Sequence, residues 1–168
     1  MLRGISVTSE KINLVELLNQ QQLCESLTVK EIQTLVDYTD VVHYKMKEVI
    51  ADIGEVGEAL FFIVKGEASL FYDEGTGETA VGVVHAGELM GEMSFFDRQP
   101  RSVRLKSSAS ETQVLKLSRP MYNRLRIEHP YIAVNLLEIA IVSLDHLFRR
   151  VSSDVATFSN YLYGRGKK

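Results

Sequence analysis

The sequence predicts an α+β fold: an antiparallel β-roll of the jelly-roll type (a double-stranded β-helix), with N-terminal helices and a long C-terminal lid or dimer helix. Short apolar and β-branched runs separated by glycine turns fill residues 41–117, which is typical of antiparallel sandwiches and rolls. Apolar residues at helical spacing occupy the flanks, about 9–38 and 118–157. We expect the 168 residues to form a single domain.

The N-terminal flank is expected to hold two helices that cover one end of the roll. Leucines at 14, 17 and 18 indicate the first helix, and apolar residues at 32, 35 and 36 indicate the second. Thr28 and Glu31 stand three residues apart before the second apolar set. This spacing predicts a capping box at the start of that helix.

The middle of the chain contains five runs that we interpret as strands. Each run is apolar or alternates with polar residues, and most are bounded by glycine. Asp73-Glu74-Gly75-Thr76-Gly77-Glu78 is a hairpin turn rather than a phosphate-binding loop, because no lysine and helix follow it. The runs are Leu60 to Val64, Ala68 to Tyr72, Thr79 to Val84, Arg101 to Lys106, and Thr112 to Leu117.

The C-terminal flank is expected to hold two helices separated at Pro130. Ser118 is a candidate N-cap with Pro120 in the first turn, and the second helix should begin near Tyr131. Apolar residues then recur at steps of four and three, which is typical of an a/d seam and predicts a homodimer contact. This seam consists of Leu137, Ile141, Leu144, Phe148, Val151 and Val155.

Composition excludes several classes of protein. Cys24 is the single cysteine, so no internal disulfide or cysteine metal cluster is expected. The formal net charge of −3 argues against a nucleic-acid-binding surface. The segment Met1 to Ser9 has no apolar stretch of a signal peptide, and the apolar stretch Tyr131 to Val142 is too short to span a bilayer. By elimination we expect a cytoplasmic protein.

The segment from Gly91 to Ser102 carries the chemistry. Gly91 allows a backbone to approach a ligand closely, and the following residues can form one helical turn whose N–H groups face an anion. Arg101 can fork onto phosphate oxygens, and Glu92 can accept a hydrogen bond from a sugar hydroxyl. These residue types match a ribose phosphate. The alternative is that Glu92 and Arg101 pair with each other on the surface.

This segment resembles the phosphate-binding cassette of the cyclic-nucleotide-binding domain family, which includes the catabolite activator protein and the regulatory subunits of cyclic-AMP-dependent kinase. The resemblance rests on Gly91-Glu92-Met93-Ser94-Phe95-Phe96, four intervening residues, and then Arg101-Ser102. It extends to the glycine turn and strand at Asp52 to Gly66 and to Ala86-Gly87-Glu88-Leu89-Met90 before the cassette. Roughly residues 14 to 155 follow the family pattern.

The resemblance implies a role for each matching residue. Glu92 would accept the ribose 2′-hydroxyl, and Arg101 would bind the cyclic phosphate together with the hydroxyl of Ser102. Backbone N–H groups near Gly91, Met93 and Ser102 would complete the cradle. The expected ligand-binding set is Gly91, Glu92, Met93, Ser94, Arg101, Ser102 and Val103, with cyclic AMP or cyclic GMP as the ligand and no cofactor.

The chain departs from the family pattern at two places. Val103 stands where the family usually has alanine, close to the expected phosphate. Leu147 and Phe148 stand where the lid helix of the activator protein offers polar groups to the base. Phe148 could stack on a purine, although it also belongs to the seam. Ser143 and Asn135 are the alternative polar contacts to the base.

Other functions are disfavoured. The histidines at 43, 85, 129 and 146 are not clustered as metal ligands, so no cupin-type metal enzyme is expected. A haem sensor would need an axial ligand, and the strand-region candidates His43 and His85 are interpreted as surface residues. A helix-turn-helix needs roughly fifty further residues, and only a short tail follows Val155. We therefore expect no catalysis, no direct DNA binding and no membrane contact.

Two hypotheses remain. In the first, a regulatory domain binds a cyclic nucleotide, and the C-terminal helix moves and alters a dimer or effector contact. In the second, the fold serves as a ligand-free dimerisation or docking module. Glu92 and Arg101 favour the first hypothesis, whereas Val103 and the apolar lid favour the second.

Overall fold

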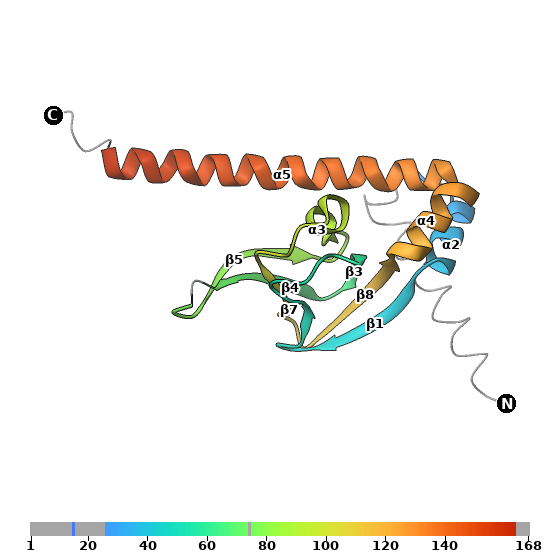
Figure 1. Cartoon of the computed structure of the whole chain (residues 1–168), viewed down its shortest axis with the longest axis horizontal. Helices are drawn as coiled ribbons and strands as arrows, with labels where there is room; N and C mark the ends of the chain where they lie inside the picture. Colours follow the sequence, from blue (N-terminus) through green and yellow to red (C-terminus); the bar gives the residue numbers. More distant parts are fainter. Residues whose placement is uncertain (1–14, 16–25, 74, 164–168) are drawn as a thin grey trace.

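The computed structural model describes residue 15 and residues 26–73 and 75–163, without the side chains of 147, 150, 151, 154 and 156–163. Eight strands form a roll, and helices flank it (Figure 1). The predicted first helix lies outside the described residues apart from Val15, which is helical and buried. The elements are α2 (Val29–Asp37), β1 (Asp40–Lys45), β2 (Val49–Ala51), β3 (Ala59–Lys65), β4 (Glu67–Asp73), β5 (Glu78–His85), β6 (Leu89–Met90), α3 (Glu92–Asp97), β7 (Arg104–Ser107), β8 (Glu111–Ser118), α4 (Arg119–Glu128) and α5 (Pro130–Tyr163).

The strands form two four-stranded antiparallel sheets, in the orders β1-β8-β3-β6 and β2-β7-β4-β5. This arrangement confirms the predicted α+β class and roll. Strand β3 explains why its sequence is a continuous apolar run rather than an alternating one. One face of β3 packs with the helices through Leu60, Phe62 and Val64, and the other face packs between the sheets through Phe61 and Ile63. Successive side chains of a strand point to opposite faces. Because both faces of β3 are buried, apolar residues follow one another along the strand without alternation.

The capping box of α2 is confirmed. The Glu31 backbone N–H donates to Thr28 Oγ1 at 3.3 Å, and the Thr28 backbone N–H donates to Glu31 Oε2 at 2.8 Å. Ser118 occupies the N-cap position of α4 and Pro120 lies in its first turn, as expected, but the Ser118 hydroxyl makes no capping hydrogen bond. Helix α5 begins at Pro130, one residue before the predicted start.

The predicted strand from Arg101 to Lys106 is wrong at its beginning, because β7 starts at Arg104. The backbone N–H of Arg101 donates to Glu55 O, and the Arg101 carbonyl accepts from the Gly54 N–H, each at 2.9 Å. These bonds hold Arg101 against the turn before β3 instead of in a strand ladder. The residue is therefore part of a loop that faces α3.

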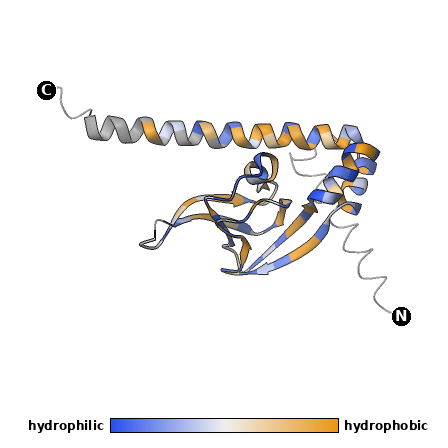
Figure 2. Cartoon of the chain, viewed as in Figure 1, coloured by the Kyte–Doolittle hydropathy of each residue, from blue (hydrophilic) through white to orange (hydrophobic). Residues whose placement is uncertain are grey.

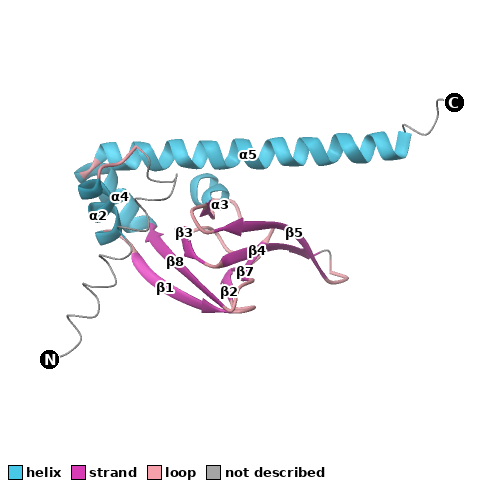
Figure 3. Cartoon of the chain, turned by 180° about the vertical axis from the view of Figure 1, so that it is seen from behind, coloured by secondary structure: helices cyan, strands magenta, loops and turns pink. Residues whose placement is uncertain are grey.

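Helix α5 lies along one side of the roll, directly over α3, and continues beyond β5 in both views (Figures 1 and 3). Near its beginning it is packed in the helical core through Ile132, Leu136 and Ala140, which are at most 2% exposed. Figure 2 shows apolar residues recurring along the part of the helix beyond that contact. This placement puts α5 above the segment that carries the cassette.

Candidate functional site

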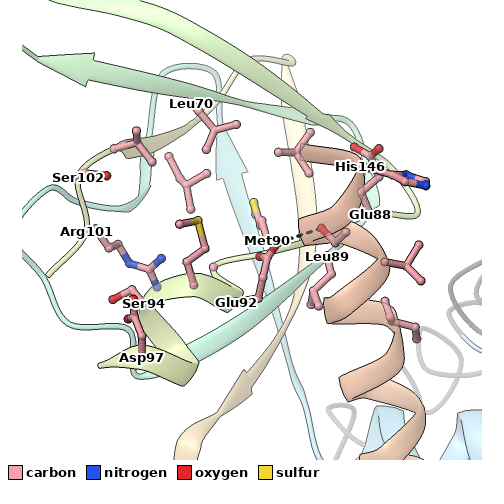
Figure 4. Close-up of a pocket in the computed structure, with 18 of the residues that line it drawn as sticks. Leu70, Glu88, Leu89, Met90, Glu92, Ser94, Asp97, Arg101, Ser102 and His146 are labelled. Atoms are coloured by element: carbon pink, nitrogen blue, oxygen red, sulfur yellow. Dashed lines mark hydrogen bonds between the residues drawn. The ribbon is translucent and has the colours of Figure 1, made fainter. Parts of the chain in front are cut away.

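A cavity of about 770 Å³ lies between α5, the cassette and strands β4, β5 and β7 of the second sheet (Figure 4). Its walls come from segments that are distant in the sequence. The cassette contributes Gly91, Glu92, Met93, Ser94, Arg101, Ser102 and Val103; the strands contribute Leu70, Val83, Val84 and Leu105; α5 contributes Asn135, Glu138, Ile139, Val142, Ser143 and His146. The structure thus brings all seven predicted ligand-binding residues to one cavity.

Gly91 forms the sharp turn that begins α3. Its φ of +89° is in the left-handed region, where a side chain is strained. A Cβ at this position would lie 3.2 Å from Phe61 Cδ2 and 3.3 Å from Arg101 Nη2. The absence of a side chain therefore lets the guanidinium approach the turn. Helix α3 then forms the helical turn predicted for the cassette.

The Arg101 guanidinium is the cation of the cavity. The side chain is half-buried and forms no ion pair within the part of the chain that the structure describes. Burial lowers the pKa of Arg101, while the nearby carboxylates of Glu55 and Glu92 act in the opposite direction. Because arginine stays protonated in proteins, the cavity holds a positive charge without a partner in contact. That arrangement suits an anionic ligand.

Glu92 lies in the same wall but is buried, with 8% of its surface exposed. The Ser143 hydroxyl of α5 donates to Glu92 Oε1 at 2.9 Å. Burial raises the pKa of Glu92, and this effect exceeds the lowering by its hydrogen bonds and by Arg101. A surface pair of Glu92 with Arg101 is not formed, so the alternative explanation for these two residues is not supported.

Ser94 holds the cassette together. Its Oγ accepts from the Gly57 N–H at 2.7 Å and donates to Gln99 O at 2.6 Å. Gly57 was not among the predicted site residues, although it lies in the glycine turn that carried the resemblance. A Cβ on Gly57 would come within 2.6 Å of Phe95 N and 3.0 Å of Arg101 Nη2. Gly57 therefore lets the turn before β3 pack directly on α3.

The remaining cassette residues that line the cavity are less buried than Glu92 and Ser94. The side chain of Met93 is 57% exposed, and Ser102 is also exposed. Val103 is half-buried in the wall, and the cavity remains open beside it. The methyl groups of Val103 thus do not close the site.

The lid contacts are only partly those that were expected. Ser143 lines the cavity, but Phe148 does not and is 72% exposed, because it lies on another face of α5. The side chain of Leu147 lies outside the described residues. Asn135 also lines the cavity; it is 6% exposed, and its Oδ1 has no hydrogen-bond partner among the residues that the structure describes.

Sequence reasoning missed four cavity residues of α5: Glu138, Ile139, Val142 and His146. Their signal was the helical spacing of three and four from Asn135. That spacing defines a second face of the helix, distinct from the apolar seam. Among the predicted seam residues, Ile141, Phe148 and Val155 are 62–72% exposed and Leu137 is 38% exposed. Leu144 is half-buried, and the side chain of Val151 lies outside the described residues.

The described residues contain no cluster of three or more histidine, cysteine, aspartate or glutamate side chains arranged to hold a metal ion. Within the same residues, no helix has both the length and the hydropathy needed to cross a membrane.

Known proteins resemble this chain in sequence and in fold. Residues 41–129, more than half of the chain, match the model of the cyclic nucleotide-binding domain. A cAMP-dependent protein kinase regulatory subunit of Emericella nidulans is 31% identical over 108 residues, which cover 64% of this chain and 26% of the subunit. The cyclic AMP receptor protein of Thermus thermophilus is 28% identical over 143 residues, which cover 77% of this chain and 66% of the receptor. The chain thus spans less than two thirds of either relative.

Solved structures agree on the fold. The catabolite activator protein of Thermus thermophilus superposes with a TM-score of 0.67 at 27% identity, covering 82% of this chain and 64% of that protein. A cyclic nucleotide-binding domain from Methylobacillus flagellatus has a TM-score of 0.76 at 24% identity and covers 89% of this chain and 84% of that domain. The second likeness concerns the fold alone.

Proposed function

Since this chain belongs to the cyclic nucleotide-binding domain family, we propose that it is a regulatory sensor that binds cyclic AMP or cyclic GMP and signals through α5. Cyclic AMP is the first candidate, because the similar proteins of Emericella nidulans and Thermus thermophilus are named for it. We also place the sensor in the cytoplasm.

The observation that carries the proposal is the Arg101 guanidinium in an open cavity. It lies beside the Gly91 turn and has no ion-pair partner among the described residues. A cyclic phosphate would supply the missing negative charge and accept hydrogen bonds from the guanidinium. A docking module with no ligand gains nothing from keeping this cation half-buried, because burial of an unpaired charge costs free energy.

The residues that line the cavity define the contacts that we propose for the sugar and the phosphate. Arg101 and Ser102 would bind the cyclic phosphate, and the Glu92 carboxylate would accept the ribose hydroxyl. The Ser94 hydroxyl donates its single O–H to Gln99 O and accepts from the Gly57 N–H, so it has no hydrogen left to donate to a phosphate. We therefore assign to Ser94 the task of holding the cassette, rather than a direct bond to the ligand.

Helix α5 is the output element in this proposal, because one of its faces lines the cavity and another is apolar and exposed. Ser143 touches the cassette directly. Ile141 and Phe148 are exposed on the seam. Burial of such a stripe against a second copy of the helix would yield a homodimer. A shift of α5 on binding would then alter that contact or an effector's contact.

No chemical step is proposed, in keeping with the regulatory and receptor relatives.

The decisive experiment is a titration of the purified chain with cyclic AMP and cyclic GMP by calorimetry, with 5′-AMP as the control for an open phosphate. A thermal melt provides a second readout. Ligand at a hundred times its Kd adds about 2.7 kcal/mol to the free energy of unfolding, which raises the Tm by several degrees. If neither cyclic nucleotide gives heat or a Tm shift, the sensor function is rejected and the ligand-free docking module stands.

A further inference from the structure

Arg119 is the first residue of α4 and joins three parts of the molecule. Its side chain is 16% exposed and its Nε lies 3.0 Å from Glu58 Oε2. Its Nη2 donates to the Phe95 carbonyl at 2.8 Å and also to the Gly57 carbonyl. The guanidinium stacks over the Phe95 ring, with 4.3 Å between Cζ and the ring centroid. The guanidinium thus combines two main-chain hydrogen bonds from one nitrogen with an ion pair through Nε and a ring contact through its planar face.

The two carbonyls belong to segments that also hold each other. Phe95 lies in the middle of α3, and Gly57 lies in the turn before β3. The Gly57 N–H donates to Ser94 Oγ, and its α-carbon leaves no room for a methyl group against Phe95 N. Arg119 therefore closes a junction of the glycine turn, the cassette helix and the start of α4.

The far side of this junction is the ligand cavity. A Cβ on Gly57 would lie 3.0 Å from Arg101 Nη2, so the phosphate anchor is in contact with the same turn. On the near side, α4 leads into α5 at once. The His129 N–H donates to Leu125 O, and the Ala133 N–H donates to His129 O. The contacts of Arg119 therefore connect the cassette to the α4–α5 unit independently of Ser143.

We propose that Arg119 is a positioning residue that couples the cassette to α4 and α5, so that occupancy of the cavity changes the stability of α4. The contacts of Arg119 are present in the ligand-free molecule, and the part of Arg119 in signalling rests on the proposed function. A residue that only filled space at the α4 terminus would not need to bind two main-chain carbonyls of other elements.

Three variants separate this role from a structural one. Arg119→Met removes the charge and the fork. Arg119→Lys keeps a cation that can donate to the carbonyls, but it lacks the planar guanidinium that stacks on Phe95 and the Nε–H that pairs with Glu58. Glu58→Gln removes the ion pair alone and is the matched control, because the Glu58 side chain is 70% exposed. Circular dichroism first establishes that each variant folds.

The readout is amide hydrogen exchange by mass spectrometry over α3 and α4, with and without saturating cyclic AMP. Without ligand, Arg119→Met should exchange about tenfold faster in α3, a separate element, and Arg119→Lys should lie between it and the parent, while Glu58→Gln matches the parent. With ligand, the parent should gain protection in α3 and α4, and Arg119→Met should gain it in α3 only.

Unchanged α3 exchange in ligand-free Arg119→Met, or full α4 protection in that variant with ligand, would overturn the proposal. If the parent binds no cyclic nucleotide, the proposed function fails by itself. The ligand-free comparison then still decides whether Arg119 clamps the cassette. The two failures are therefore distinguishable in one set of samples.

Discussion

The hydroxyl of Ser143, on the helix that covers the cavity, donates to the buried carboxylate of Glu92 at 2.9 Å. In the proposed complex the same carboxylate accepts a ribose hydroxyl. Ser143 and the ligand therefore compete for, or share, one buried acceptor. This contact connects the position of α5 directly to the state of the cassette.

Ser143→Ala tests that connection. Removing the donor leaves Glu92 buried with one hydrogen bond fewer, which should lower the free energy of unfolding of the ligand-free protein by about 1.5–3 kcal/mol. The affinity for cyclic AMP should rise several-fold, because the ribose hydroxyl no longer has to displace Ser143. Denaturant melts and calorimetry measure the two effects. Ser152→Ala, at an exposed position of α5, is the control, and weaker binding by Ser143→Ala would refute competition.

Glu92 should make the stability of the protein depend on pH. Burial raises the pKa of this carboxyl in the folded state. The folded protein therefore binds more protons than the unfolded chain between the ordinary carboxyl pKa, about 4.3, and the raised value. The free energy of unfolding falls as the pH rises through that window, and the loss is complete above the raised pKa.

Glu92→Gln should remove this contribution. The variant should be more stable than the parent at pH 7.5, and the difference should shrink toward pH 4.5. Binding of cyclic AMP should weaken at the same time, because a charged acceptor is replaced by a neutral one. Glu48→Gln removes a charge from an exposed position outside the cavity and serves as the control. An identical pH profile for Glu92→Gln and the parent would show that the buried carboxyl is not the cause.

Arg101→Ala should abolish binding with little effect on the fold. Truncation of one partner of a buried charge pair costs about 2–5 kcal/mol, so the Kd should rise at least about thirtyfold. Because Arg101 makes its fold contacts through the backbone, the Tm should change by about 2 °C at most. Arg101→Lys keeps the charge and should retain part of the affinity. A large fall in Tm would instead make Arg101 a structural residue.

Gly57→Ala should damage the site more than the fold. Its methyl group would meet Phe95 N at 2.6 Å and Arg101 Nη2 at 3.0 Å, so α3 and the guanidinium must move apart. Overpacking of this kind costs about 1–3 kcal/mol. Gly75→Ala is matched in stability cost, since Gly75 has a φ of +83° and open space around it; the strain there is about 1–2 kcal/mol. Calorimetry should show that only the first variant loses affinity, and equal affinities would contradict the prediction.

Ile141→Asp should separate a dimer formed through the seam. The side chain is 65% exposed, so the substitution should leave the monomer folded, while a buried charge in a helix pair is strongly unfavourable. Light scattering after gel filtration measures the mass. Ser153→Asp, also exposed on α5 but outside the seam, should leave the mass unchanged. A constant mass for Ile141→Asp would show that the seam does not hold two copies together.

Local features were predictable because their causes are local. The capping box at Thr28 follows from three-residue spacing, and the turn at Gly91 follows from the backbone that glycine permits. The side-chain type of Arg101 predicted its place in the site, but the sequence placed it in a strand rather than in a loop. Its loop is set by main-chain bonds to Gly54 and Glu55, which lie almost fifty residues earlier, and nothing in the segment itself reveals them.

The sequence by itself determined the alternation of strands and turns, the helical flanks and the residue types of the cassette, because each depends on neighbours within a few positions. Only the tertiary structure decided which face of α5 meets the cavity. The face of Asn135 and Ser143 does so, whereas Phe148 lies in solvent. The rotation of a helix about its axis is set by the packing of its first turns on the helical core, and that packing joins residues from both ends of the chain.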